Sequence, residues 1–557
     1  MIGTDAGASL VPIADGASRQ HVRAAAFAFV GLTLQVVSIV AVASKLGIAN
    51  AAFERSLPVI AVAFVIHYWL PQRLRLPFFA LLSIGLLGFV LGCGARGWEP
   101  VDALQRTAIV VIVGSCLIAI CRLKLPFWVR VSALVCAAGV LAFWRVESIA
   151  HPIFGAIWPV LGSMFMFRLM LYVYEVEHQR EPPGMWQTIA YFFMLPNVCF
   201  PLSPVVDWRA FGREYYNGEP IRIYQTGLRW IVRGLIQCIG YELISSHAYL
   251  DAASVTDGEQ LARYLFSNYG LYLRVSGHFH IVAGVLHLFG WNLGETNHQY
   301  YLANSFTDYW RRVNIYWKEL ILTLFYNPVA YRVRRTSAVR AVLAGSVAAF
   351  IATWFLHGYQ AFWLTGGFRF SLPDALFWAI LGGLVIANAN REAKRPRVRQ
   401  LVRKFDLRQL AASSLRTVGV FATLCLLWSL WSCSSLSAWV ELWQHFDAAS
   451  GVWLLLGLLS IFVCKFAVES VEVLGGALLP HRLRGGDGQP RQWVIALFTC
   501  ALPLGLLWLT QGTLFELTRA PETRQAPRIG ASLREANEYS TGRGYYEDLI
   551  ELSAPRW

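Results

Sequence analysis

Two polar residues lie at the edges of strongly apolar stretches and could carry acid–base chemistry. His357 follows the run "ATWFL", and Asn314 lies within "SFTDYWRRVNIYWKELILTLFYNP", residues 305–328. An imidazole, whose ordinary pKa is about 6.5, suits a general base near neutral pH. A carboxamide cannot act as a base, but its NH2 group can donate a hydrogen bond to a developing oxyanion. We therefore take His357 and Asn314 as the candidate catalytic pair.

Both residues also have a purely structural interpretation. A His beside Gly at the end of an apolar helix often serves only as a hydrogen-bonded structural residue, and Asn314 could cap the helix that follows it. A further cluster, His278, His280, His287 and His298, raises the question of a metal site. Because its spacing includes no HExxH-like pattern, we expect no metal there. We assign His278 and His280 to the lining of a polar cavity, with structural hydrogen bonding as the alternative.

The composition indicates a membrane protein. The chain has 557 residues, of which 56% are hydrophobic and 15% charged, and its mean hydropathy is +0.46. Soluble domains carry about 25% charged residues. The net charge of +14 fits Lys and Arg gathered in cytoplasmic loops and not nucleic-acid binding, because no basic soluble domain is present to carry it. The ten cysteines form no CxxC pair, so neither a disulfide framework nor a zinc site is indicated.

Apolar runs long enough to cross a bilayer recur along most of the chain, and they predict an all-α polytopic membrane protein. Two runs, 186–200 and 317–330, are short, and we expect re-entrant or interfacial helices there. A third, 261–291, should be broken. The full set of candidate spans is 24–43, 57–71, 76–95, 107–121, 130–148, 153–174, 186–200, 228–245, 261–291, 317–330, 338–357, 374–390, 415–433, 452–474 and 492–511.

Arg and Lys placement gives an orientation. The loops 331–340, 391–408 and 481–491 are the most basic, and we expect all three in the cytoplasm. The spans 338–357 and 374–390 then form a hairpin whose turn, "HGYQAFWLTGGFRFSLP", faces outward. His357 is expected at the outer end of its helix, about 30 Å of rise from the cytoplasmic end.

The blocks around the two candidates resemble the membrane-bound O-acyltransferase family. "YLFSNYGLYLRVSGHFHIVAGVLHLFGWNLGETNHQYYLANSFTDYWRRVNIYWKELI" is similar to the family core, in which an "SG" helix, an "N…YYLA" link and a "WRR" element followed by His or Asn occur in this order. "TWFLHGYQAFWLTGG" resembles the second block, an apolar helix ending in His-Gly. "MLPNVCFPLSPVVDWRAF" resembles a proline-containing loop upstream of the core.

This resemblance implies a helical bundle around a central tunnel or funnel and the transfer of an acyl group from a thioester donor to an acceptor hydroxyl. His357 matches the catalytic histidine and Asn314 the second signature residue. Acyl coenzyme A or an acyl carrier protein would be the co-substrate, and no other cofactor is expected. Near the cytoplasmic side, the donor or its phosphates would meet Trp310, Arg311, Arg312 and Lys318. As an alternative, these cations mark only topology.

The acceptor class stays open. The bacterial branch that acylates polysaccharides usually has His where this chain has Asn314, and a second Trp where it has Val313. Asn at this position is more like the branch that esterifies sterols and diacylglycerol. We expect an extracytoplasmic glycan or exported metabolite as acceptor, with a lipid hydroxyl or an amine as the alternative. A lipid or saccharide transporter is the competing class.

These expectations divide the chain into five parts in a bacterial inner membrane. They are a cytoplasmic tail (1–23), N-terminal transmembrane helices (24–150), a catalytic core (151–400), C-terminal transmembrane helices (401–511) and a polar tail (512–557) on the periplasmic side. The stretch 539–552 of that tail mixes aromatic and charged residues. It could dock a periplasmic partner or lie on the membrane surface.

Overall fold

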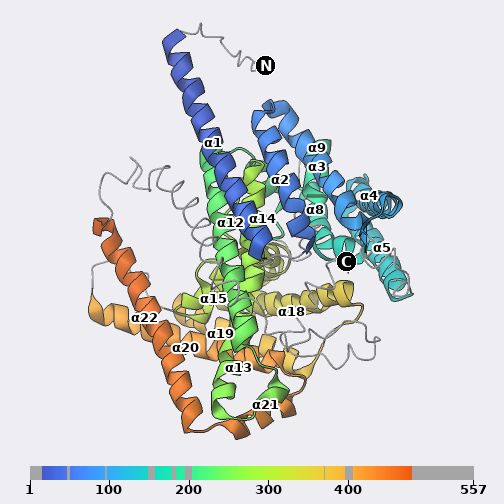
Figure 1. Ribbon diagram of the computed structural model, residues 1–557. Coiled ribbons are helices and arrows are strands. Elements are labelled where there is room, and N and C mark those ends of the chain that lie inside the picture. The colour runs from blue at the N-terminus through green and yellow to red at the C-terminus, as the bar shows by residue number, and fades with distance from the viewer. Residues whose placement is uncertain are drawn as a thin grey trace.

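The computed structural model describes residues 15–46, 51–94, 97–147, 157–178, 184–194, 204–368, 370–394 and 406–478. Within these ranges the protein is helical (Figure 1), apart from one antiparallel pair of two-residue strands, β1 (Cys93–Gly94) and β2 (Gly97–Trp98). The predicted span 492–511 and the tail 512–557, with its 539–552 motif, lie outside the described residues.

The N-terminal helices gather on one side of the molecule (Figure 1). Their first member begins inside the stretch that we expected to be a tail. Their bounds are α1 Asp15–Leu46, α2 Ala51–Trp69, α3 Gln72–Gly92, α4 Pro100–Arg122, α5 Phe127–Glu147, α7 Trp158–Val160, the π-helix η2 Leu161–Phe165, α8 Met166–Glu177 and α9 Met185–Phe192.

The middle of the chain supplies the central helices and several short turns. Their bounds are α11 Trp208–Arg213, α12 Pro220–Leu243, the π-helix η3 Ile244–Ala248, the 3-10 turn η4 Ala252–Ser254, α13 Gly258–Gly270, α14 Tyr272–Leu288, the 3-10 turn η5 Tyr300–Leu302, α15 Phe306–Arg312, α16 Ile315–Ile321, the π-helix η6 Leu322–Tyr326 and α17 Asn327–Val333.

The C-terminal helices lie below the central pair α12 and α14 in Figure 1, and α18 runs across the direction of that pair. Their bounds are α18 Ala338–Thr365, α19 Leu372–Ala393, α20 Leu407–Ser432, α21 Leu436–Leu442, the 3-10 turn η7 Trp443–His445 and α22 Ala448–Leu478.

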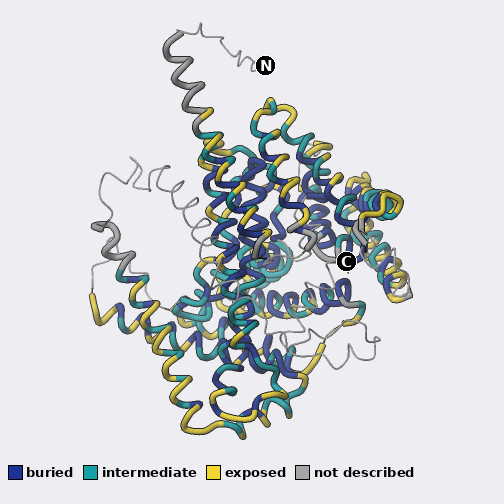
Figure 2. Tube along the Cα trace, in the orientation of Figure 1, coloured by how far each residue is buried: buried dark blue, intermediate teal, exposed yellow. Residues whose placement is uncertain are grey.

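Helices α12 and α14 pack at very short distance because glycines face each other across their contact. A Cβ atom at Gly234 would lie 2.5 Å from the Gly277 carbonyl oxygen, and one at Gly227 would lie 2.7 Å from the Gly284 oxygen. Small residues allow such backbone approach in membrane helices, where van der Waals packing rather than hydrophobicity drives association. This pair forms the buried centre of the molecule (Figure 2).

The outside of the molecule is apolar. Leu455 on α22 is 67% exposed and Trp128 on α5 is 71% exposed, and many large aliphatic side chains near them are more than half exposed. Water would make such a surface unfavourable, so it is suited to lipid chains. Seven described helices are long and apolar enough to cross a membrane. The described chain is thus a multi-pass helical membrane protein, as the hydropathy predicts.

One predicted boundary is wrong, and it concerns His357. Helix α18 does not end at His357-Gly358 but continues to Thr365, where Gly366 takes a left-handed φ of +89° and its N–H bonds the Phe362 carbonyl. The glycine at 358 has another purpose. A Cβ there would lie 2.3 Å from the ring of Phe370, which folds back over the helix. Close packing, and not helix termination, requires this glycine.

Other predicted spans are confirmed or revised. The break expected within 261–291 falls at Leu271, between α13 and α14. The span 153–174 is not one regular helix, because η2 interrupts it before α8 begins. The short span 186–200 holds only the eight-residue α9 in its described part, too short to cross alone. The run 317–330 is α16, η6 and α17 joined end to end.

Cysteine labelling tests the predicted orientation at the two ends of α18. Gly367 and Thr336 are both exposed, in the turns after and before this helix. In a cysteine-free background, Gly367→Cys should react with an impermeant maleimide added to whole cells, whereas Thr336→Cys should react only after the inner membrane is opened. The opposite pattern would reverse the topology, and equal labelling would contradict a crossing by α18.

Candidate active site

His357 is held in one tautomer by its own helix. Its Nδ1 lies 2.8 Å from the carbonyl oxygen of Thr353, one turn earlier. A carbonyl can only accept, so Nδ1 carries the proton, and Nε2 keeps its lone pair in the neutral ring. The side chain is partly exposed, and Nε2 is therefore the atom of this residue that can take a proton from a ligand.

Two indole rings from other helices enclose the imidazole. The ring of Trp317, on α16, lies 5.1 Å from that of His357 in an edge-on contact, and the ring of Trp378, on α19, lies 4.8 Å away. Both tryptophans are buried. The imidazole therefore sits where α16, α18 and α19 meet, in apolar surroundings that strengthen any electrostatic interaction with a ligand.

The carboxylate of Asp374 holds two further tryptophans near this aromatic enclosure. Asp374, in the first turn of α19, accepts hydrogen bonds from Trp354 Nε1 at 2.5 Å and from Trp431 Nε1 at 2.8 Å. These indoles belong to α18 and α20, so one side chain joins three helices. Trp354 precedes His357 by three residues, which ties the carboxylate to the turn that carries the imidazole.

Asn314 caps α16, as its structural interpretation predicts. Its Oδ1 accepts a hydrogen bond from the backbone N–H of Trp317 at 3.3 Å. Its backbone is left-handed, with φ +39°, a conformation that Asn tolerates better than most residues. Since Oδ1 is occupied, the donor group Nδ2 is the part of the side chain that remains to interact with a ligand. The cap and a donor role are compatible.

Asn297, in the connection between α14 and α15, holds the backbone of Asn314 in place. Its side chain is fully buried, and its Oδ1 accepts the Asn314 backbone N–H at 2.7 Å. On either side of this contact the two segments pair through their backbones: Ile315 N–H bonds the Thr296 carbonyl, and His298 N–H bonds the Arg312 carbonyl, both at 2.9 Å. The residues 292–314, which we call the connecting segment, are thereby closed into a rigid loop.

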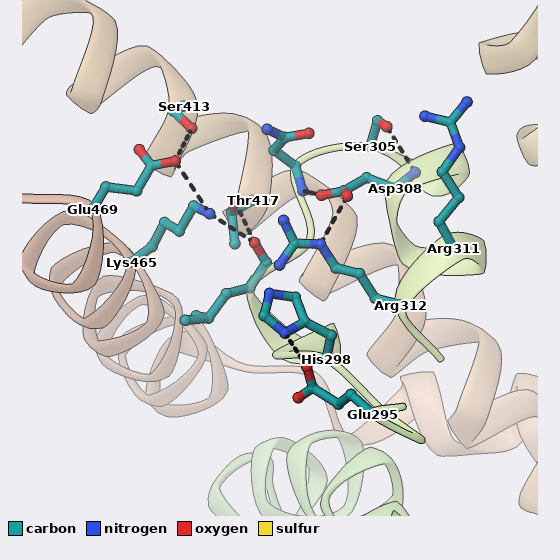
Figure 3. Close-up of polar contacts among 12 residues, drawn as sticks. Glu295, His298, Ser305, Asp308, Arg311, Arg312, Ser413, Thr417, Lys465 and Glu469 are labelled. Atoms are coloured by element: carbon teal, nitrogen blue, oxygen red, sulfur yellow. Dashed lines mark hydrogen bonds and ion pairs between the residues drawn. The ribbon is translucent and has the colours of Figure 1, made fainter. Parts of the chain in front are cut away.

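Ion pairs join the same segment to other helices near both of its ends: Glu295 accepts from Arg233 of α12 at 2.5 Å, and Arg311 contacts Glu392 of α19 at 3.4 Å. Other polar contacts lie within the segment (Figure 3), such as the one from His298 Nδ1 to Glu295 at 2.6 Å. Further along, Asp308 accepts from Arg312 Nε at 2.7 Å. The segment thus connects the central helix α12 to the helices that surround His357.

A buried ion pair on α22 contacts the middle of the connecting segment. Lys465 and Glu469 are 4% and 3% exposed, and their charged groups lie 3.3 Å apart. Lys465 Nζ also donates to the Leu302 carbonyl at 2.9 Å, and Glu469 accepts from Ser413 of α20 at 3.1 Å (Figure 3). An ionisable pair inside a membrane span survives only with such partners, so this cluster fixes η5 against α20 and α22.

The predicted donor-binding residues lie on α15 and α16, next to Asn314. The ring of Trp310 packs on Phe350 of α18 at 4.6 Å. Arg312 pairs with Asp308, and Lys318 with Glu319 at 3.0 Å. Arg311 is 64% exposed and makes a 3.4 Å contact with Glu392. Exposed ion pairs of this kind contribute little to the free energy of folding, so Arg311 can exchange Glu392 for an anionic ligand.

Three histidines of the cluster, His278, His280 and His287, lie on α14 where it packs on α12, whereas His298 lies in the connecting segment, where its N–H bonds the Arg312 carbonyl. His278 and His280 are buried; His280 Nδ1 bonds Gln237 at 2.7 Å, and its ring stacks on Trp230. His287 Nδ1 bonds the Ala283 carbonyl at 2.7 Å. This placement fits structural hydrogen bonding better than the cavity lining that we expected. Among the described residues no group of three or more His, Cys, Asp or Glu side chains is arranged to hold a metal.

The structure brings the two candidate blocks together through Trp317. Asn314 caps the helix turn that carries this indole, and the indole contacts His357. Sequence reasoning missed the supporting residues. Asn297 lies inside the "N…YYLA" block but was given no role. Lys465 and Glu469 stand four residues apart in a predicted span, a signal that could have identified them. Trp317 and Trp378 are indistinguishable from core aromatics in sequence.

Comparison with protein-family models and with curated proteins finds no match for this chain.

Substitutions at Asn314 separate its cap from its backbone conformation. Asn314→Ala loses the cap and forces a left-handed Ala, and should lower the free energy of unfolding by about 1–3 kcal/mol. Asn314→Gly loses the same cap without backbone strain and should cost clearly less. Asn314→Asp keeps both features and should unfold near the wild-type temperature. Equal losses for Ala and Gly, measured by thermal unfolding in detergent, would contradict the left-handed conformation.

The buried Lys465–Glu469 ion pair leads to a second prediction about stability. Lys465→Met leaves a buried carboxylate uncompensated and should destabilise the protein by about 3–5 kcal/mol. The double variant Lys465→Met/Glu469→Leu removes both charges and should regain much of that loss. Unfolding of the single and double variants in detergent checks this. If the loss of unfolding free energy in the double variant equals the sum of the losses in the two single variants, the two charges do not stabilise each other.

Proposed function

We propose that this protein is a membrane-embedded acyltransferase that moves an acyl group from a thioester donor to an acceptor hydroxyl, with His357 as general base. The observation that carries the proposal is the tautomer of His357. Its Nδ1 proton is committed to the Thr353 carbonyl, and the basic Nε2 belongs to a partly exposed ring enclosed by Trp317 and Trp378.

The reaction needs little more than this arrangement. Nε2 takes the proton of the hydroxyl as its oxygen attacks the thioester carbonyl carbon, and the carbonyl electrons move onto oxygen. When the tetrahedral adduct collapses, the C–S bond breaks and the imidazolium returns its proton to the thiolate. The products are an ester and a free thiol, so no redox cofactor is required. Water must be kept away for the acceptor hydroxyl to compete.

The residues near Asn314 suit the donor side of this reaction. Arg311 is the exposed cation of the group and holds Glu392 only weakly, so the phosphates of coenzyme A can displace that carboxylate. An acidic carrier protein would use the same charge. Asn314 lies two residues after the end of α15, and its NH2 group, which has no hydrogen bond to the cap it forms, would orient the thioester.

We propose two classes of acceptor. A hydroxyl on an extracytoplasmic glycan or an exported metabolite is the first choice. The Asn at position 314 favours a lipid hydroxyl or an amine as the second, through the family resemblance alone. Mass spectrometry of acylated products from cells with and without the protein would distinguish these acceptors.

Replacing His357 tests the proposal directly. With a panel of labelled acyl-coenzyme A donors, His357→Ala should lose acyl transfer and thioester hydrolysis by about 10²–10⁴-fold, the usual contribution of a general base. His247 is the matched control, because its Nδ1 also contacts the carbonyl four residues back but its side chain is exposed. His247→Ala should retain activity.

Unchanged turnover in folded His357→Ala would exclude this residue as the base. A wild-type protein that neither transfers nor hydrolyses any donor, but exchanges lipid or saccharide between leaflets of a proteoliposome, would favour the transporter class.

A further inference from the structure

Trp317 carries a buried hydrogen-bond donor that the fold leaves unused. Its side chain is 7% exposed, and its Nε1–H finds no acceptor within the described part of the chain. An unsatisfied buried donor destabilises the folded state, and a native structure needs a reason for each. Trp230 of α12 has the same deficit among the described residues, so the location of Trp317 must decide what its donor does.

Trp317 lies between the two candidate residues. Its ring touches His357 at 5.1 Å on one side and Phe167 of α8, also at 5.1 Å, on another. Its backbone N–H is fixed by the Asn314 cap. The first turn of α16 therefore carries the Trp317 indole against the imidazole, and the Asn314 side chain caps that same turn. Trp378 touches the same imidazole but comes from α19, away from the cationic segment that suits the donor.

We propose that the Trp317 indole N–H is an oxyanion donor that binds the thioester carbonyl oxygen; this inference rests on the proposed acyl transfer. As the acceptor oxygen attacks, negative charge gathers on the carbonyl oxygen, and the N–H stabilises it until the C–S bond breaks. A donor without a protein acceptor is already desolvated, so no existing hydrogen bond has to break when the charge develops. This makes Trp317 a catalytic residue alongside His357.

Removal of the N–H alone tests the role. Trp317→Phe keeps a ring against His357 and should lower kcat for acyl-coenzyme A hydrolysis or transfer by about 10²–10³-fold, as loss of one oxyanion donor does. KM should change little. Trp363→Phe is the matched control. It removes another buried indole N–H, from α18, whose ring packs on Tyr359 and Trp158 and not on His357, and it should retain activity.

The pH profile separates an oxyanion donor from a packing residue. In Trp317→Phe the plateau of log kcat should fall while the inflection stays at the wild-type pH, because the base is unchanged. A shifted inflection would mean that the indole only shapes the surroundings of His357, and would overturn the proposal. A larger fall for Trp378→Phe than for Trp317→Phe would overturn it as well.

Binding measurements distinguish failure of this inference from failure of the proposed function. An S-alkyl coenzyme A thioether lacks the thioester carbonyl, so wild type and Trp317→Phe should bind it equally. If His357→Ala is inactive and Trp317→Phe is fully active, acyl transfer stands and the oxyanion role falls. If wild type neither binds the thioether nor cleaves any acyl donor, both proposals fall.

Discussion

The hydrogen bond from the Asn314 backbone N–H to the buried Asn297 side chain is the contact on which the candidate site depends. Irregular backbone at membrane depth must find its partners inside the protein, since lipid offers none. Several backbone groups of the connecting segment obey this rule: the N–H of Asn314 donates to the Asn297 side chain, and the Leu302 carbonyl accepts from Lys465. The ion pair of Glu295 with Arg233 adds a side-chain contact to α12. Without these partners the segment could not stay folded beside α18.

That contact also explains why a strained backbone is stable at Asn314. A left-handed φ is costly for residues with a side chain, and two such residues, Gln299 and Asn314, lie in or directly at the end of this segment. The cost is offset where the surroundings determine the conformation. At Asn314 the backbone N–H is held by Asn297 and the side chain is held by the first turn of α16. The geometry that seats Trp317 against His357 follows from these two bonds.

The sequence predicted the helices better than their arrangement. Hydropathy located the apolar helices because membrane spans need only length and composition, and the Asn314 cap followed from residue type and position. The end of α18 was mispredicted because Gly358 looks like a terminator in sequence, whereas its real partner, Phe370, lies beyond the turn. The contact of Trp317 with His357 could not be foreseen, because it depends on how α16 and α18 pack and not on local pattern.

The true end of α18 changes what the acceptor must do. With the helix stop at Gly366, His357 lies eight residues before Thr365, about 12 Å of rise inside that end. Where α18 crosses a bilayer along its length, as its hydropathy indicates, a site at this position lies within the hydrocarbon region, whose thickness is about 30 Å. Under the proposed acyl transfer, an acceptor hydroxyl would then have to enter from the end of α18 or laterally from lipid, and a water-soluble glycan would have to insert its reacting end. For that proposed reaction, this depth favours acceptors with a slender or amphipathic reacting end and would keep water from the thioester.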